Sequence, residues 1–254
     1  MRRPLENRAE AETGPGAGAG SAGEAGPPAA LLFIHGWRGS ASGVMRNAAL
    51  TAFADEIGAA LIAPEGLETT WSYPGSPSQA RDEFAFFDAL NRDLQARHGV
   101  APAQMVVSGF SMGASMAWSL ACRRGGEYAG FIAFAGAFWE PLPPRCADRP
   151  AALIHIHGTS DQTVPIGGRP IGLRFAQGDV FESFAVLRET GAASTMRPET
   201  RAGTVGGPQC RTWADTPTLL FCHHDGGHFW RVPWLRAAWA RLRPTGSTPK
   251  RGSP

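Results

Sequence analysis

Residues 105–122, MVVSGFSMGASMAWSLAC, decide the fold of this chain. The apolar run Met105–Ser108 predicts a strand, and it leads directly into the pattern G-x-S-x-G at Gly109–Gly113. The small and apolar residues that follow predict a helix over Met112–Cys122. So tight a turn imposes unusual backbone angles on Ser111 and leaves no space beside it, which explains a glycine on each side. We therefore expect Ser111 to stand above a sheet, at the positive end of a helix.

Short apolar runs alternate with helical patterns along the rest of the chain. The predicted strands are Ala30–His35, Leu61–Ala63, Phe131–Ala135, Leu153–His157 and Leu219–His223, and the predicted helices are Gly43–Ile57, Ser78–His98 and Pro233–Leu242. Because the strands lack period-2 alternation and are separated by helices, they predict an α/β protein whose mostly parallel sheet has helices on both faces. Such sheets bind ligands at the carboxyl ends of their strands.

The two ends of the chain differ in composition from its centre. Residues 1–28 are rich in Gly, Ala and Glu, and residues 244–254 contain almost no large apolar side chain. Such segments cannot bury enough surface to offset their ordering entropy, so both are expected to be disordered. The remaining residues, 29–243, are predicted to form one domain. Apolar residues make up 43% of the chain, which is enough for a substantial core.

Composition also excludes several classes of function. The net charge of +2 and the lack of any Lys/Arg run argue against a nucleic-acid partner. The only lysine, Lys250, lies in the tail, so neither a P-loop lysine nor a Schiff-base lysine is available in the core. No apolar stretch approaches the roughly 18 residues of a membrane span, and no apolar segment typical of a signal peptide follows Arg2 and Arg3. A monomer is expected.

An acid and a base follow Ser111 in the order that such a nucleophile needs. A serine hydroxyl reacts only when a base takes its proton, and an acid must orient that base. Asp161 follows the strand Leu153–His157, and His228 follows the strand Leu219–His223 and a pair of glycines. This chain order of serine, acid and histidine accompanies the G-x-S-x-G turn. We predict Ser111, Asp161 and His228 as the catalytic residues.

Other acids and histidines fit these roles less well. Asp179, Asp215 and Asp225 do not follow the right strand, and His223 and His224 are alternates that lie nearer to their strand. His35 is expected to be a structural loop residue, and His98, at a helix end, to be solvated. The pair His155 and His157 has the H-x-H spacing of metal ligands, but further ligands are not spaced for such a site. We therefore predict no metal.

The developing oxyanion of an acyl transfer needs backbone N–H donors. One donor is expected from Met112, the residue after the nucleophile, and the other from Trp37 in the loop after the first strand. Trp37, Trp71, Trp139 and Trp230 all follow strands, so they predict an apolar surface around the serine, with one or two of them packed under loops. Trp71, Trp139 and Trp230 are the predicted substrate-binding residues. Helical tryptophans, by contrast, are expected in the core; they are Trp118, Trp234 and Trp239.

The four cysteines, Cys122, Cys146, Cys210 and Cys222, form no C-x-x-C pair, which disfavours a zinc ribbon or a redox motif. Their spacing alone leaves two disulfides and four buried thiols equally open.

Several segments together resemble the polyhydroxybutyrate depolymerase and feruloyl esterase-like branch of the α/β-hydrolases. They are LLFIHGWRGSASG (31–43), GFSMGAS (109–115), AGAFWEPLP (135–143), HGTSDQTVPIGGRPI (157–171) and GGHFW (226–230). The resemblance implies the α/β-hydrolase fold, the triad and oxyanion donors named above, and carboxylester hydrolysis without a cofactor. It also implies the disulfides Cys122–Cys146 and Cys210–Cys222, and secretion or export to the periplasm. The chain departs from the family where the strands expected before Leu31 are replaced by the Gly/Ala-rich segment. Since no signal peptide is visible, a cytoplasmic location is the alternative.

The expected function is a serine carboxylester hydrolase of the polyhydroxyalkanoate (polyhydroxybutyrate) depolymerase type, acting on an ester or polyester substrate. The alternatives are a feruloyl or acetyl esterase on polysaccharide esters, and a non-catalytic binding protein with the hydrolase fold.

Overall fold

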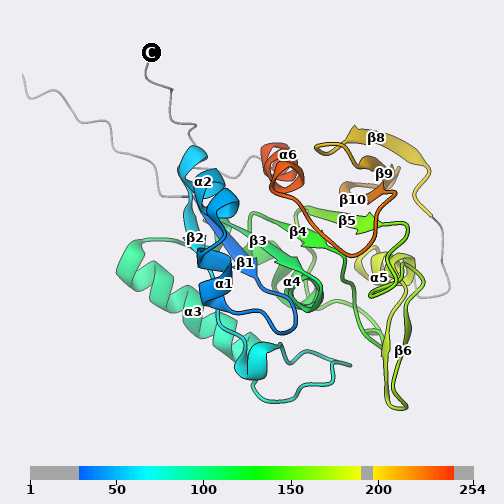
Figure 1. Ribbon diagram of the computed structural model, residues 1–254, viewed down its shortest axis with the longest axis horizontal. Coiled ribbons are helices and arrows are strands. Elements are labelled where there is room, and N and C mark those ends of the chain that lie inside the picture. Colours follow the sequence, from blue (N-terminus) through cyan, green and yellow to red (C-terminus); the bar gives the residue numbers. More distant parts are fainter. Residues whose placement is uncertain (1–28, 190–196, 243–254) are drawn as a thin grey trace, which may run out of the picture.

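A twisted sheet forms the centre of the computed structural model, which describes residues 29–189 and 197–242 (Figure 1). From one edge to the other its strands are β2 (Ala60–Ile62), β1 (Ala30–Ile34), β3 (Met105–Phe110), β4 (Gly130–Phe134), β5 (Leu153–Gly158), β10 (Thr216–His224), β9 (Gln209–Trp213) and β8 (Thr200–Thr204). The strands from β2 to β10 are parallel, and β9 and β8 extend the sheet in antiparallel fashion. The predicted α/β class with a mostly parallel sheet is confirmed.

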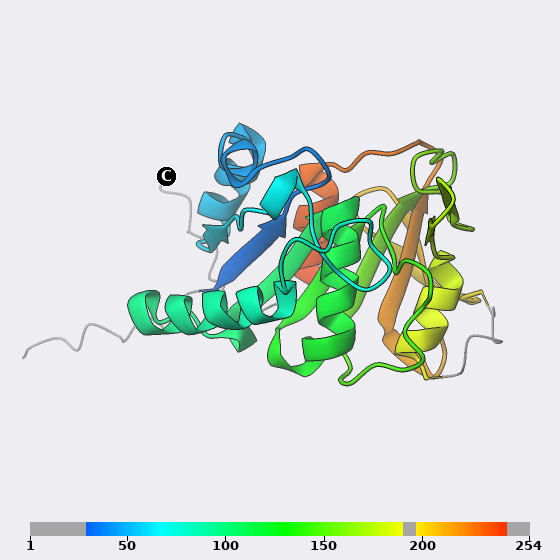
Figure 2. The ribbon, with the colours of Figure 1, turned by 90° about the horizontal axis from the view of Figure 1, so that it is seen from below.

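Helices cover both faces of this sheet, as Figure 2 shows. They are α1 (Ala41–Met45), α2 (Ala48–Glu56), α3 (Glu83–His98), α4 (Met112–Arg124), α5 (Val180–Leu187) and α6 (Val232–Leu242). Alternate residues of a strand point to opposite faces. In β1, Leu32 therefore packs in the core beneath α3, α4 and α5, whereas Leu31 packs in the core beneath α2 and α6. Burial on both sides explains why the strands read as continuous apolar runs.

Two predicted helices differ from the observed ones: one is divided in two, and the other begins later. The pattern 43–57 is divided between α1 and α2, because the Asn47 side chain accepts a hydrogen bond from the Leu50 N–H at 3.1 Å and starts a new helix. The helix expected from Ser78 begins at Glu83, after Asp82 caps it in the same way. It ends as predicted, at Gly99, whose φ of 67° lies in the left-handed region.

Helix α5 and the hairpin of β6 (Arg169–Ile171) and β7 (Phe175–Gln177) are not among the elements predicted from the sequence. A signal for α5 exists, because Asp179 stands three residues before Glu182 and accepts hydrogen bonds from the first N–H groups of the helix. The hairpin is bracketed by glycines in the stretch 167–178, GGRPIGLRFAQG, and this is a turn signal. The hairpin lies beside the candidate site described below, whereas α5 packs in the core.

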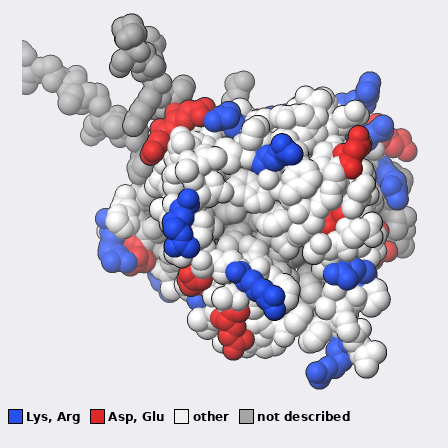
Figure 3. Space-filling view, in the orientation of Figure 1, with Lys and Arg blue, Asp and Glu red and all other residues white. Residues whose placement is uncertain are grey.

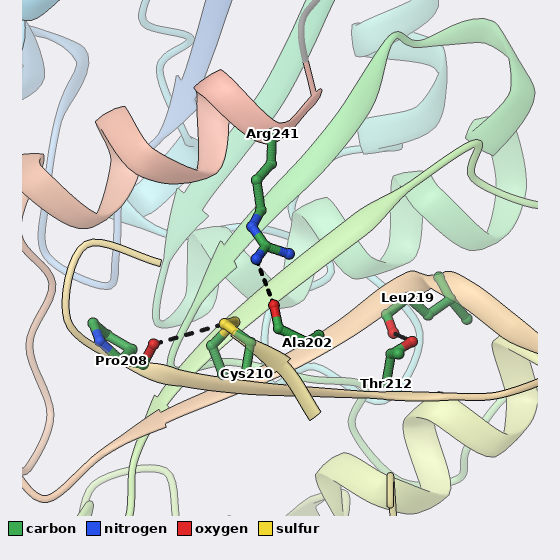
Figure 4. Close-up of a disulfide and its surroundings, with 7 residues drawn as sticks. Ala202, Pro208, Cys210, Thr212, Leu219 and Arg241 are labelled. Carbon is green, nitrogen blue, oxygen red and sulfur yellow. Dashed lines mark hydrogen bonds between the residues drawn. A yellow bond between two sulfur atoms is a disulfide. The ribbon is translucent and has the colours of Figure 1, made fainter. Parts of the chain in front are cut away.

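Both disulfides that the resemblance implied are present. Cys122 at the end of α4 bonds to Cys146 in the loop before β5. Cys210 of β9 stands opposite Cys222 of β10 in the strand register and bonds to it. Figure 4 shows Cys210 in this region, together with Arg241 of α6, which donates to the Ala202 carbonyl of β8. The disulfide and this contact fasten the antiparallel edge to the parallel part of the sheet.

The surface carries dispersed charge. In Figure 3, positive and negative side chains are interspersed, several of them side by side, around a largely uncharged centre of the visible face. Within residues 29–189 and 197–242, no helix is long and apolar enough to cross a bilayer. The segments predicted to be disordered, 1–28 and 244–254, lie outside the described residues.

We expect the replacement of both Cys122 and Cys146 by alanine to lower the free energy of unfolding by about 3 kcal/mol. The two cysteines are 24 residues apart, and a cross-link over a loop of this length restricts the unfolded chain by roughly that amount. Urea unfolding followed by tryptophan fluorescence measures the change. The matched pair of replacements at Cys210 and Cys222, 12 residues apart, should cost slightly less. A double variant as stable as the wild type would contradict the expectation.

Candidate active site

Ser111 occupies a strained turn between β3 and α4. Its φ of 56° and ψ of −122° lie outside the regions that L-residues ordinarily adopt. The turn is held on both sides, since the Ser111 N–H donates to the Phe134 carbonyl of β4 at 2.9 Å and its carbonyl accepts from the Ser115 N–H. The predicted strand–turn–helix unit is therefore present, and the serine is fixed by the strand next to its own.

Glycines are required around Ser111 because backbone segments touch there. A Cβ at Gly109 would lie 2.3 Å from the Gly113 carbonyl oxygen, and one at Gly113 would lie 2.1 Å from the Ile34 carbonyl oxygen. Either side chain would push α4 away from the sheet. The close contact with Ile34 also brings the loop after β1 against the nucleophile turn.

Asp161 lies in the loop after β5 with its carboxylate completely buried. Its Oδ1 accepts hydrogen bonds from the N–H groups of Thr163 and Val164, both at 2.9 Å, and its Oδ2 accepts one from His228 Nδ1 at 2.7 Å. Burial alone would raise the pKa of Asp161, but the bonds from His228 and Val164 outweigh it and lower the pKa below its usual value. The carboxylate is thus ionised and aimed at one imidazole.

His228 reaches Asp161 because the loop after β10 packs directly on the end of β5. A Cβ at Gly158 would lie 2.2 Å from the Gly226 carbonyl oxygen and 2.4 Å from that of Gly227, so only glycine permits this contact. Since an ionised carboxylate only accepts hydrogen bonds, Nδ1 of His228 carries the proton. Its Nε2 is then left as a base.

The imidazole of His228 lies next to the nucleophile turn. Its ring packs against Phe110, the residue before Ser111, with ring centroids 4.7 Å apart. Among the described residues, no hydrogen bond joins the Ser111 hydroxyl to His228. Without a substrate, contacts between a nucleophile and its base are often long, and they shorten in the reactive complex.

The loop after β1 supplies backbone N–H groups close to Ser111. A Cβ at Gly36 would lie 3.4 Å from Cβ of Ser111, and the neighbouring Trp37 N–H has no acceptor among the described residues. The loop is fixed from below, because the Trp71 indole donates to the His35 carbonyl at 2.8 Å. Met112 is the first residue of α4, and the first N–H groups of a helix have no partner within it. Trp37 and Met112 can therefore both offer an N–H at this point.

A cavity of about 470 Å³ opens beside Ser111. Four regions of the chain form its walls: the loops after β1 and β2, the turn of Ser111 with α4, the loop after β4 that carries Trp139, and the segment that runs from the Asp161 loop to the hairpin β6–β7. The lining residues are Trp37, Glu68, Thr70, Pro77, Ser78, Ser111, Met112, Ser115, Trp139, Thr163, Val164, Arg169, Ile171 and Gln177.

The four loop tryptophans have different positions. Trp37 and Trp139 line the cavity, and Trp37 is 61% exposed. Trp71 is completely buried and packs against Phe87, so its predicted contact with substrate does not fit its position. Trp230 packs on Phe33 and Phe134 and is not part of the lining. Two of the four thus lie under loops, as allowed for above, and the helical tryptophans are buried as expected.

The competing residues have other partners. His35 is buried, and its ring bonds to the Gly36 carbonyl and the Gly66 N–H. His98 is exposed at the end of α3, and His224 packs on Phe229 and Trp234. Asp179 caps α5, and Asp215 pairs with Arg188. Asp225 is exposed, and His223 lies beside Phe221.

His155 and His157 point to the same side of β5 and bond to each other at 2.8 Å. Within the described part of the chain, no group of three or more His, Cys, Asp or Glu side chains could hold a metal ion.

The part of the cavity wall that comes from the hairpin β6–β7 was not predicted from the sequence. Arg169 and Ile171 of β6 and Gln177 of β7 line it, and Arg169 Nε donates to the Thr163 carbonyl at 3.0 Å. The glycine bracketing noted above predicts a hairpin, but not its position over the site. That position depends on contacts with a distant segment, since Trp139 pairs with Gln177.

Comparisons with known proteins identify the type of fold. A family model described as phospholipase/carboxylesterase matches residues 81–170. An esterase-named protein of Nocardia uniformis subsp. tsuyamanensis, NocK, is 30% identical over 81% of this chain and 66% of its own length. Feruloyl esterase C of Emericella nidulans is 25% identical over 67% of this chain and 57% of its own length. The match thus spans less than two thirds of either relative.

The solved structure of esterase PE8 has the same fold, with a TM-score of 0.53 and 21% identity over 86% of this chain and 94% of its own. The expectation of an α/β-hydrolase fold is confirmed, and so is the resemblance to esterases of that fold.

We expect the free energy of unfolding to fall as the pH drops below 6.5. Burial lowers the pKa of both His155 and His157 from the usual 6.5. Below pH 6.5 the unfolded chain binds protons at these positions while the folded chain does not, so acid favours unfolding until the folded-state pKa is reached. Each histidine contributes a slope of at most about 1.4 kcal/mol per pH unit, which applies where it is protonated in the unfolded chain and neutral in the folded one.

Urea titrations between pH 7.5 and 5 measure this slope. His155→Phe should reduce it by at least one histidine's share, because it removes one of the two buried histidines. His98→Gln, a change at an exposed histidine, is the matched control and should leave the slope as it is. A slope that His155→Phe does not alter would show that burial does not lower the pKa of His155 in the folded protein.

Proposed function

We propose that this chain, an esterase-like α/β-hydrolase, hydrolyses carboxylic esters with Ser111 as nucleophile, His228 as general base and Asp161 as the acid that orients it. One arrangement supports this activity most directly: a buried, ionised carboxylate holds an imidazole at 2.7 Å, and that imidazole lies beside a serine on a strained turn that borders a cavity. The three groups come from loops at the carboxyl ends of β3, β5 and β10, where α/β sheets bind their ligands.

The first half of the reaction acylates the serine. His228 Nε2 takes the Ser111 proton while the hydroxyl oxygen attacks the ester carbonyl, and Asp161 stabilises the resulting imidazolium. The negative charge that develops on the carbonyl oxygen is stabilised by the N–H groups of Trp37 and Met112. When the tetrahedral intermediate collapses, the ester C–O bond breaks and the alcohol leaves with the proton from His228.

The second half returns the enzyme to its starting state. Water enters, His228 removes its proton, and the hydroxide attacks the acyl-enzyme carbonyl. The same N–H groups stabilise the second intermediate, which collapses to release the acid while His228 returns the proton to Ser111. No cofactor takes part in these steps.

For the substrate we favour an ester of a phenolic acid such as ferulate. Feruloyl esterase C of Emericella nidulans is among the relatives. The cavity suits an aromatic acyl group, since most of its lining surface is apolar and comes from side chains such as Trp139, Val164 and Ile171, while polar residues lie among them.

Polyhydroxybutyrate is the second candidate, and a feature of the surface supports it. Large apolar side chains stand exposed at or near the cavity: Trp37 (61%) lines it, Leu67 (44%) precedes the lining residue Glu68, and Leu173 (103%) lies two residues after Ile171. Exposed apolar groups around a site mark contact with a large apolar partner, such as the surface of a polyester. We also propose export to an oxidising compartment, because the two disulfides are stable in such an environment.

A fluorophosphonate probe tests the nucleophile. We expect the wild type to become labelled covalently and Ser111→Ala to remain unlabelled, because only a serine activated by a base attacks the phosphonate. Intact-mass spectrometry reads the result, and Ser115→Ala, which changes a second cavity-lining serine, is the matched control that should still label. A folded wild type that stays unlabelled would favour the non-catalytic binding protein.

A substrate panel separates the two candidate substrates. We expect release of ferulate from methyl ferulate and feruloylated sugars with a kcat/KM at least about tenfold above that for hydroxybutyrate oligomers, a difference of about 1.4 kcal/mol in transition-state stabilisation. Product chromatography quantifies both. Efficient cleavage of the oligomers and of polyester film, with no action on feruloyl esters, would reverse the preference.

A further inference from the structure

A continuous chain of hydrogen bonds runs through the core beneath the candidate site. The Trp118 indole Nε1 lies 3.2 Å from His155 Nδ1, His155 Nε2 lies 2.8 Å from His157 Nδ1, and His157 Nε2 lies 2.7 Å from the Val164 carbonyl oxygen. The three aromatic side chains belong to residues with no exposed surface. The chain thus connects α4, the helix after Ser111, to the loop that carries Asp161.

The two ends of this chain set its direction. An indole nitrogen can only donate and a carbonyl oxygen can only accept, so His155 must accept at Nδ1 and His157 must donate at Nε2. The bond between the imidazoles is then a donation from His155 Nε2 to His157 Nδ1. Each neutral ring has one donor and one acceptor, so both residues are confined to the Nε2–H tautomer.

The last N–H of the chain lies against the catalytic acid. His157 Nε2 is 3.5 Å from Asp161 Oδ2, the oxygen that also accepts from His228. The same N–H donates to the Val164 carbonyl, while the Val164 N–H donates to Asp161 Oδ1 at 2.9 Å. The Nε2–H of His157 therefore stabilises the Asp161 loop. In the other tautomer, Nε2 would instead direct a lone pair at the Val164 carbonyl oxygen and at Asp161 Oδ2.

We propose that His157 is a positioning residue for Asp161, and that Trp118 and His155 maintain the tautomer in which it acts. This inference rests on the proposed function of Asp161. Packing alone does not account for the pair, because His155 lies among aromatic rings such as Phe184 and Phe221, where phenylalanine would fill the space without burying polar atoms. Two buried histidines are tolerable there because every ring nitrogen is paired.

Protonation of His157 is the state that the chain prevents. The titratable groups that face His157 are His155 on β5, Asp161 in the next loop, and His224 and His228 from the loop after β10. If the N–H of His155 were removed, Nδ1 of His157 could take a proton, and an imidazolium would then stand beside Asp161. Its charge would compete with His228 for the carboxylate.

Nitrogen-15 NMR of the wild type tests the tautomers without reference to activity. Long-range ¹H–¹⁵N correlations at pH 7 should show both His155 and His157 protonated at Nε2 only. Nδ1 protonation of either ring, or a cationic ring, would overturn the inference. This result decides the matter even where a core variant fails to fold.

Kinetics on p-nitrophenyl butyrate test the positioning role. His155→Phe keeps a ring but removes the donor to His157, so kcat should fall about tenfold, as expected for one lost hydrogen bond, with KM nearly constant. The acid limb of kcat/KM should move to higher pH. His155→Gln offers one acceptor and one donor and should restore both the rate and the pH profile.

The outcomes separate the two proposals. A wild type that hydrolyses no ester would refute the proposed function. The NMR experiment would still show whether His155 and His157 have the tautomers that the hydrogen-bond chain requires. An active wild type with His155→Phe unchanged in rate and pH profile, or with His155→Gln as impaired as His155→Phe, would overturn the positioning role.

Discussion

Direct backbone contact at the carboxyl ends of the central strands is the constraint on which the rest of this structure depends. Gly113 rests on the Ile34 carbonyl, and Gly158 rests on the carbonyls of the loop after β10. At these distances no side chain fits, so glycine alone allows loops from β1, β3, β5 and β10 to meet. The strained angles of Ser111 persist because these neighbours hold the turn from several directions.

The same crowding makes a buried charge tolerable. The Asp161 carboxylate lies out of solvent, a position that disfavours its ionised form unless donors surround it. Two backbone N–H groups and the His228 imidazole provide those donors, and His157 adds a further N–H nearby. Burial and hydrogen bonding therefore act together, since the carboxylate is held in one orientation and its charge is directed at one imidazole.

Local signals in the chain were sufficient for most of the sheet and for the choice of the residues that the structure brings together at the candidate site. The apolar runs gave the parallel strands within three residues at each end, and the G-x-S-x-G pattern gave the strained turn that presents Ser111, the proposed nucleophile. Asp161 and His228 could be selected because each follows a strand, and parallel strands end at one edge. The boundary errors at Asn47 and Asp82 arose where a capping side chain outweighed the apolar pattern.

The sequence by itself determined the fold class, the order of the chemical groups along the chain and the turn that presents Ser111, because each of these follows from short-range patterns and strand order. Only the tertiary structure decided which tryptophans line the cavity. It also showed that the hairpin β6–β7 forms one cavity wall, and that His155 and His157 are linked to each other and to Trp118. These features depend on contacts between residues tens of positions apart. The distance and direction of such contacts are set by how helices and loops pack on the sheet, which no local pattern records.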